Sequence, residues 1–275
     1  MSAVQLLFPP GNDDFLAHCI VSGESRVVSL VGAGGKTSTL FWLADALQQR
    51  GARVLITTTT RMQFPDSRFG FHCFVEPDFP ARMAQAAALT DTPRIAAVFS
   101  AFDAGLQKAT GCLPAEVDAL KAAGVADVIL VEADGAHHQS LKAPAAHEPC
   151  IPASSDMVVA LTGGEVLLRP AQASGIHRWA EFSVLTGVRE GDLLDEAVFD
   201  RLLSDPAGMF KNTPARAHRH WVINAQSTGD AGVFSMLESL MKSHPELDGV
   251  WLGNMRNPNP FTQAWVRNDR MHKDD

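Results

Sequence analysis

A glycine-rich stretch combines the residue types that hold phosphate groups: Gly32-Ala33-Gly34-Gly35-Lys36-Thr37-Ser38. It stands between an apolar run with β-branched residues and a segment with helical spacing. Glycines let backbone N–H groups turn toward phosphate oxygens, and a helix N-terminus adds partial positive charge. We expect Lys36 to reach the β- and γ-phosphates of a nucleotide, and the Thr37 hydroxyl to bind Mg²⁺. The alternative is an ordinary strand-to-helix turn.

The spacing of this loop departs from the commonest phosphate loop. The pattern G-x-x-x-x-G-K-[ST] needs glycine at position 30, where Leu30 stands. The remaining G-x-x-G-K-T resembles the loop of the ATP site in Mur ligases. A dinucleotide fingerprint, G-x-G-x-x-G, would need glycine at position 37, where the residue is threonine. The spacing therefore favours a nucleoside triphosphate and argues against a dehydrogenase.

Two acids, Glu132 and Asp134, close the apolar run at 126–131. An acid at the end of a buried strand in a phosphate-loop protein usually orients Mg²⁺ or its water. Because alternate residues of a strand face the same side, both carboxylates are candidates for the metal site. The alternative is a capping acid followed by an Asp-Gly turn.

Four threonines, Thr57 to Thr60, close another strand and are followed by Arg61. The carboxyl ends of parallel strands form the ligand-binding edge of an open α/β sheet. We therefore expect Thr58 and Thr59 to contact the nucleotide and Arg61 to grip phosphate through two hydrogen bonds. Threonine is also an ordinary strand residue, so a purely structural role remains open for the hydroxyls.

The segment at 137–149 is rich in groups that bind anions or move protons. Lys142 is a candidate for binding a second anion or a transferring phosphoryl group, and His147 and Glu148 are candidates for a base or a metal ligand. His137 and His138 are adjacent, so they could share a metal only in a loop, since strand neighbours diverge. The alternative is a solvated loop.

Elements that would position these residues alternate along the chain. Compact apolar runs predict strands at 26–31, 53–58, 71–75, 94–100, 126–131, 157–161, 220–224 and 249–252. Helical spacing predicts helices at 36–50, 79–89, 114–123 and 234–243. This alternation predicts an α/β fold with a doubly wound, mainly parallel sheet. We expect one domain over 1–275, with 162–216 as a possible insertion or small lobe.

Composition limits the classes of partner. The chain has 275 residues, 46% of them hydrophobic, and a formal net charge of −8. An acidic chain without a basic surface argues against broad binding of nucleic acid or anionic membranes. None of the four cysteines forms a C-x-x-C pair, and we see no signal peptide or membrane span, so a cytoplasmic location is expected.

Three segments together resemble one known family: VGAGGKTS (31–38), ITTTTRM (56–62) and VEADGAHHQSLKAPAAHEPCIP (131–152). They are similar to the YqeC family, which is linked to maturation of selenium-dependent molybdenum hydroxylases or to selenium cofactor biosynthesis. The resemblance implies nucleotide binding. ATP is the expected nucleotide and GTP is possible, because Asn224-Ala225-Gln226-Ser227 lacks the lysine and aspartate of a guanine-specific Asn-Lys-x-Asp motif.

Two functions follow as hypotheses. The first is an enzyme that uses Mg-ATP to activate or phosphorylate a small selenium- or molybdenum-related acceptor, with catalytic roles for Lys36, Arg61, Lys142, His147 and Glu148. The second is a nucleotide-gated chaperone or metallochaperone for an apo-hydroxylase, in which a partner stimulates slow hydrolysis. An anion-binding protein without catalysis is a third, weaker alternative, because it does not need the acidic strand end.

Overall fold

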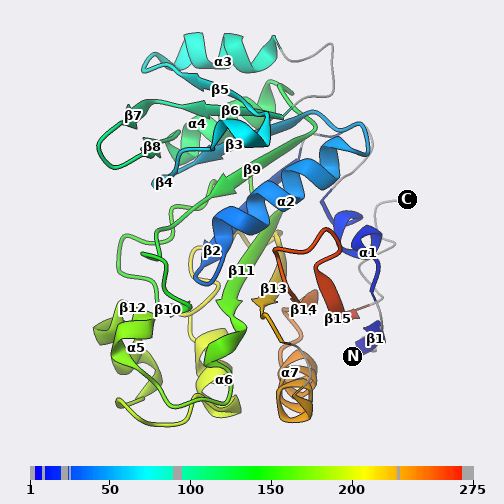
Figure 1. Cartoon of the computed structure of the whole chain (residues 1–275), viewed down its shortest axis with the longest axis vertical. Helices are drawn as coiled ribbons and strands as arrows, with labels where there is room; N and C mark the ends of the chain where they lie inside the picture. The colour runs from blue at the N-terminus through cyan, green and yellow to red at the C-terminus, as the bar shows by residue number, and fades with distance from the viewer. Residues whose placement is uncertain are drawn as a thin grey trace.

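One large sheet forms the centre of the computed structural model, which describes residues 4–7, 10–19, 24, 26–88, 95–227 and 230–267 (Figure 1). The sheet has ten strands in the order β1-β15-β14-β13-β11-β2-β9-β3-β6-β5. The strands from β14 to β5 run parallel. At one edge β15 pairs antiparallel with β14, and β1 pairs antiparallel with β15. The expectation of an α/β fold with a mainly parallel sheet is confirmed.

Eight of the ten described sheet strands coincide with predicted apolar runs, whereas β1 and β15 were not predicted. In chain order the ten strands are β1 (Val4–Leu7), β2 (Arg26–Gly32), β3 (Val54–Thr58), β5 (His72–Val75), β6 (Ile95–Phe99), β9 (Val128–Glu132), β11 (Met157–Gly163), β13 (His218–Asn224), β14 (Gly249–Gly253) and β15 (Phe261–Arg267). Four central strands are buried almost throughout, namely β2, β3, β9 and β11. Because both of their faces are covered, their sequences are continuous apolar runs and do not alternate between apolar and polar residues.

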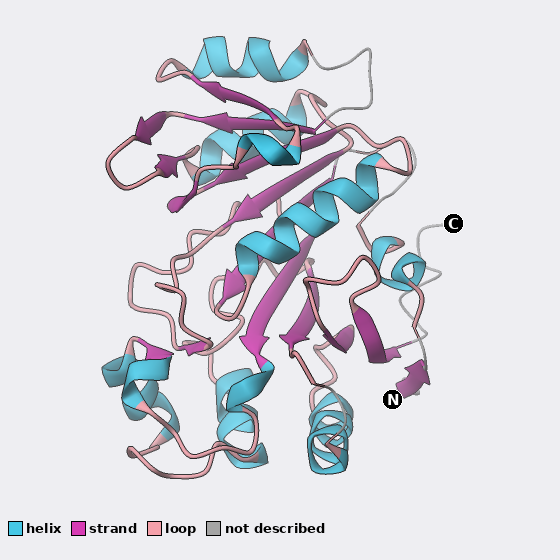
Figure 2. Ribbon diagram, in the orientation of Figure 1, coloured by secondary structure: helices cyan, strands magenta, loops and turns pink. Residues whose placement is uncertain are grey.

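Helices cover both faces of the sheet (Figure 2). One face packs against α1 (Asn12–Leu16) and α2 (Lys36–Gln48). The other packs against α3 (Phe79–Ala87), α4 (Pro114–Ala122), α5 (Trp179–Thr186), α6 (Glu196–Ser204) and α7 (Ala231–Ser243). Residue 89, the last of the helix predicted at 79–89, and residue 94, the first of the strand predicted at 94–100, lie outside the described part of the chain.

The order in which the chain adds strands to the sheet reverses at β2. From β2 the chain passes through α2 to β3, and later returns to β9, which lies between them. From β9 it crosses to β11 on the other side of β2. In an open α/β sheet such a reversal leaves a crevice at the carboxyl ends of the strands, where ligands bind. The glycine-rich loop at 32–35 lies at this point.

Smaller elements surround the same edge of the sheet. A three-stranded antiparallel sheet consists of β4 (Arg61–Gln63), β7 (Ala101–Asp103) and β8 (Lys108–Thr110). A parallel pair, β10 (Leu141–Lys142) and β12 (Ile176–His177), joins two loops. Short 3-10 turns lie at η1 (Ser67–Phe69), η2 (Gly164–Val166) and η3 (Ala173–Gly175).

The segment at 162–216 packs onto the sheet through its helices. The ring centroids of Phe199 in α6 and Trp221 in β13 lie 5.5 Å apart, and both residues belong to one buried cluster.

Within the described residues, no helix combines the length and apolar character that crossing a membrane requires.

Candidate functional site

Three glycines of the loop have backbone angles and surroundings that exclude a side chain. Gly32, Gly34 and Gly35 have φ of 90°, 83° and 118°. A Cβ atom on Gly32 would lie 2.4 Å from the Leu161 carbonyl oxygen, and one on Gly34 would lie 2.1 Å from the Gly163 nitrogen. The loop is therefore pressed against the carboxyl end of β11, and only glycine permits both the φ values and the close approach.

Hydrogen bonds hold the loop in this shape. The N–H of Ala33 donates to the Leu161 carbonyl at 3.0 Å, and the N–H of Gly34 donates to the Gln139 carbonyl at 2.9 Å. The Asn224 amide donates to the Gly34 carbonyl at 2.8 Å. The first N–H groups of an α-helix have no acceptor within the helix. The first turn of α2, residues 36–38, thus supplies the backbone donors of this site, whereas Gly32, Ala33 and Gly34 shape it.

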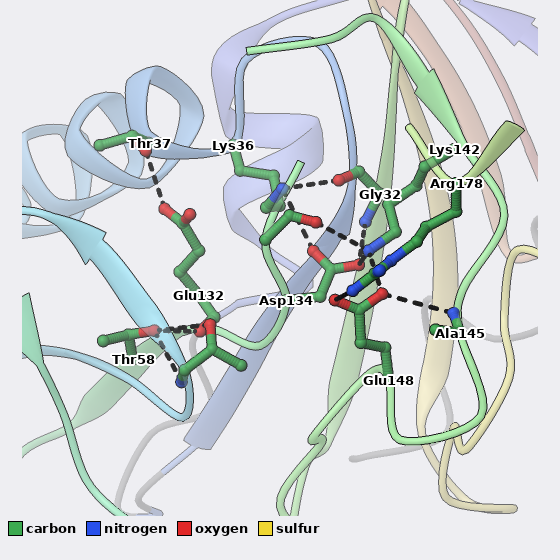
Figure 3. Close-up of polar contacts among 12 residues, drawn as sticks. Gly32, Lys36, Thr37, Thr58, Glu132, Asp134, Lys142, Ala145, Glu148 and Arg178 are labelled. Carbon is green, nitrogen blue, oxygen red and sulfur yellow. Dashed lines mark hydrogen bonds and ion pairs between the residues drawn. The ribbon is translucent and has the colours of Figure 1, made fainter. Parts of the chain in front are cut away.

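The Lys36 side chain folds back over the loop toward Asp134 (Figure 3). Its Nζ donates to the Gly32 carbonyl at 2.6 Å and lies 3.1 Å from Asp134 Oδ1. Asp134 Oδ2 lies 2.9 Å from Lys142 Nζ and accepts from the Gly32 N–H at 3.0 Å. Lys142 also contacts Glu148 at 3.1 Å. The structure thus brings four of the predicted site residues into one buried row.

Glu132 and Asp134 contact different side chains. Glu132 Oε2 accepts from the Thr37 hydroxyl at 2.8 Å, and Figure 3 shows the carboxylates on opposite sides of Lys36. Burial raises the pKa of Glu132, although Lys36 and the Thr37 hydrogen bond act in the opposite direction. Among the described residues no lysine forms an ion pair with Glu132, so this buried carboxylate next to a hydroxyl is the member of the pair that suits a divalent cation.

Hydroxyls of the threonine run donate hydrogen bonds to backbone carbonyls within the protein. The Thr58 hydroxyl is fully buried and donates to the Glu132 carbonyl at 2.7 Å, and the Thr59 hydroxyl donates to the Cys150 carbonyl at 2.7 Å. These bonds tie β3 to β9 and to the segment before β11. Thr60 and Arg61 instead line the open space in front of the loop, with Arg61 exposed.

A cleft of about 1520 Å³ extends from the loop across the carboxyl edge of the sheet. Its lining includes residues 34–38, the predicted residues Arg61, Glu132, His147 and Glu148, and both His137 and His138. The Lys and Arg side chains that line it are Lys36, Arg61, Lys108, Arg169 and Arg256, and the acids are Glu132, Glu148, Glu165 and Asp230. The lining thus carries five basic and four acidic side chains, which is close to balance, whereas the whole chain has a net charge of −8.

The segment at 137–149 forms an ordered wall of this cleft. His137 and His138 have φ of 47° and 61°, and the His137 ring stacks on His177 with centroids 4.9 Å apart. Lys211 donates to the carbonyls of Ala145 and Ala146, at 2.6 and 3.0 Å. His147 is exposed to the cleft. Across the described residues, no three His, Cys, Asp or Glu side chains converge as a metal site would require.

Sequence reasoning missed several lining residues. Lys108 comes from the three-stranded sheet and Asp230 caps α7, and both line the cleft. Arg178, which follows β12, lies 3.6 Å from the lining residue Glu148. By sequence, Asn224 stands out only as part of a guanine motif, whereas both ends of its amide are used: it donates to the Gly34 carbonyl and accepts from the Met255 N–H at 3.0 Å. Its place at the end of a parallel strand is the signal that points to this edge.

Comparison with known proteins agrees with the motifs that line the cleft. The family model described as YqeC protein matches residues 28–180, which include the glycine-rich loop, both acids and the segment at 137–149. A protein of Escherichia coli (strain K12), described as the uncharacterized protein YqeC, is 40% identical over 241 residues, covering 87% of this chain and 91% of its own. The chain belongs to the YqeC family.

Proposed function

We propose that this protein binds a Mg-nucleoside triphosphate, ATP in the first instance, and uses it to activate or phosphorylate a small acceptor. The observation that carries the proposal is the position of Lys36. Lys36 is the first residue of α2, and its ammonium group lies against a loop whose shape requires glycine at positions 32, 34 and 35. Both lie at the reversal point of a parallel sheet. Backbone donors, a helix N-terminus and a lysine in this arrangement suit the β- and γ-phosphates.

The residues beside the loop suit a magnesium ion that accompanies the nucleotide. Thr37 and Glu132 would hold it, since their oxygens are already 2.8 Å apart and the Glu132 carboxylate is buried without a bonded cation. A bound Mg²⁺ supplies charge neutralisation at the phosphate oxygens. Asp134 is engaged by two lysines and a backbone N–H, so the metal role falls to Glu132.

The cleft has room for a second substrate. Sites for one small ligand usually have about 300–1,000 Å³, and this cleft has about 1520 Å³. Arg61 approaches from β4, and His147 lies on the segment that follows Asp134. In the proposal, Arg61 stabilises charge on the transferring phosphoryl group and His147 acts as a base toward the acceptor. Glu148 holds the segment through Lys142 and Arg178.

The cellular role rests on the family. Membership in the YqeC family supports placing the reaction in maturation of selenium-dependent molybdenum hydroxylases or in selenium cofactor biosynthesis. The acceptor would then be a small selenium- or molybdenum-related compound. The size and polar lining of the cleft favour this enzyme over a nucleotide-gated chaperone, which has no need of an acceptor pocket.

The test is calorimetric titration of Mg-ATP and Mg-GTP into the wild type, Lys36→Ala and Lys242→Ala. Lys242 is an exposed lysine on α7 and serves as the control. We expect saturable binding by the wild type and the control, and loss of binding in Lys36→Ala. The ratio of the two affinities tests whether ATP is preferred to GTP. Absence of binding by the folded wild type would refute the proposal.

A further inference from the structure

A row of charged side chains connects the glycine-rich loop to the segment at 137–149. Lys36, Asp134, Lys142 and Glu148 follow one another with nitrogen–oxygen distances of 3.1, 2.9 and 3.1 Å. Their side chains are 2 to 8% exposed. Figure 3 shows Asp134 between the two lysines. At this burial the contacts are weakly screened, so removal of one charge changes how strongly its neighbours attract each other.

The two lysines differ in their partners. Lys142 Nζ donates to the Gly135 carbonyl at 2.8 Å and to Glu148 Oε2 at 3.1 Å, and it forms an ion pair with Asp134 Oδ2 at 2.9 Å. Lys36 Nζ donates to the Gly32 carbonyl at 2.6 Å and forms an ion pair with Asp134 Oδ1 at 3.1 Å. Among the described residues, Lys142 thus has three close oxygen partners for its three N–H groups and Lys36 has two, so Lys36 is better placed to take a ligand. Lys142 cannot bind an anion in the cleft without giving up part of this network.

We propose that Lys142 is a positioning residue, which acts through Asp134 to determine how readily Lys36 is released to the nucleotide phosphates. The inference rests on the proposed nucleotide-binding function. In the described state Lys36 is held by Asp134, and binding of phosphate requires Lys36 to exchange that carboxylate for phosphate oxygens.

The physical reason is the cost of a buried carboxylate that loses its partner. Removing one member of a buried ion pair is strongly destabilising, because the remaining charge is left uncompensated. When Lys36 moves to phosphate, Asp134 keeps Lys142 at 2.9 Å and the Gly32 N–H at 3.0 Å. Lys142 thus compensates the negative charge of Asp134 whether or not Lys36 is bound to it, and this lowers the free-energy cost of moving Lys36 to phosphate. Without Lys142, Asp134 would depend on Lys36 and retain it.

A purely structural role for Lys142 would not produce the following pattern of affinities. Lys142→Met should weaken Mg-ATP binding by about tenfold or more, in the range of ordinary coupling between sites. Asp134→Asn still accepts the Gly32 N–H but no longer competes for Lys36, so its affinity should equal or exceed that of the wild type. The double variant should recover affinity to within about threefold of Asp134→Asn.

A matched lysine separates charge compensation from simple ordering of the segment. Lys211 also donates to the segment, through the carbonyls of Ala145 and Ala146, whereas the described ion pairs of Asp134 are with Lys36 and Lys142. Lys211→Met should therefore leave Mg-ATP affinity within about threefold of the wild type. Lys142→Arg, which keeps the charge, should rescue most of the affinity that Lys142→Met loses.

The experiment is calorimetric titration of Mg-ATP into these variants, each checked for folding by its thermal transition. If Lys142→Met does not fold, Lys142→Gln takes its place, because its amide can still donate to Glu148. A wild type that binds Mg-ATP, with a double variant as weak as Lys142→Met or a Lys211→Met variant equally weakened, overturns the inference and leaves the proposed function intact. A folded wild type that binds no nucleotide overturns both.

Discussion

Replacing Gly34 by alanine tests whether the close contact between the loop and β11 is what shapes the site. The added Cβ would lie 2.1 Å from the Gly163 nitrogen and 2.6 Å from the Gly163 Cα. Both are backbone atoms of a central strand end, so they cannot rotate away as a side chain would. The loop must move outward, and the first turn of α2 must move with it.

Gly51 provides the control, because its φ of 85° nearly equals the 83° of Gly34 while a Cβ added to it would meet nothing within 4 Å. Alanine in the left-handed region costs about 1–2 kcal/mol at either position. Overlap with well-packed neighbours adds about 1–3 kcal/mol at Gly34 alone. We therefore expect the free energy of unfolding to fall by about 1–2 kcal/mol in Gly51→Ala and by about 2–5 kcal/mol in Gly34→Ala.

The assay combines urea denaturation with titration of Mg-ATP. Gly51→Ala should bind Mg-ATP like the wild type, and Gly34→Ala should lose measurable affinity even where it is fully folded. If the two variants were equally stable and bound the nucleotide equally well, the contact with β11 would have no part in shaping the loop, and our account of the three glycines would be refuted.

The remaining predictions concern Glu132 and His18. Glu132→Gln keeps the hydrogen bond from Thr37 but removes a buried carboxylate whose pKa is raised by burial, so thermal stability at neutral pH should rise or stay unchanged. The difference between ATP affinity with Mg²⁺ and ATP affinity without it should shrink. An unchanged magnesium dependence contradicts the metal assignment. Burial, with a smaller effect of His218, lowers the pKa of His18 from 6.5 to about 4. Because this histidine binds its proton more readily in the unfolded chain, stability should fall as the pH falls from 6.5 to 4, by up to about 3 kcal/mol. Urea denaturation across that range should show a shallower fall in His18→Phe, and equal slopes would contradict the role of His18.

The sequence predicted the parts of the fold that local patterns specify. Apolar runs followed by glycine or an acid identified β2 and β9, and helical spacing identified α2, because burial on both faces and helix periodicity leave their mark within a few residues. The antiparallel edge strands β1 and β15 and the three strands of the small antiparallel sheet were not predicted. β4, β7 and β8 are three residues each with mostly exposed side chains, so they carry no periodic signal.

The candidate site divides in the same way. The glycine-rich loop with Lys36, and the acids Glu132 and Asp134, were evident from residue type and from their position after apolar runs. The partners of those side chains were not. Asp134 pairs with Lys142, eight positions along the chain, and Thr58 turns its hydroxyl to the Glu132 carbonyl instead of the cleft.

By itself, then, the sequence determined the order of the eight parallel strands from β2 to β14 and of the helices α2, α3, α4 and α7, the glycine-rich turn between β2 and α2, and the family. These depend on interactions between near neighbours in the chain, which residue type and spacing record. Only the tertiary structure decided that Glu132 faces Thr37 while Asp134 is shared by two lysines, and that Asn224, 190 positions after Gly34, anchors the loop. Such choices depend on which strand ends are brought together and on how many acceptors each buried donor finds there, and neither is recorded in any local stretch of sequence.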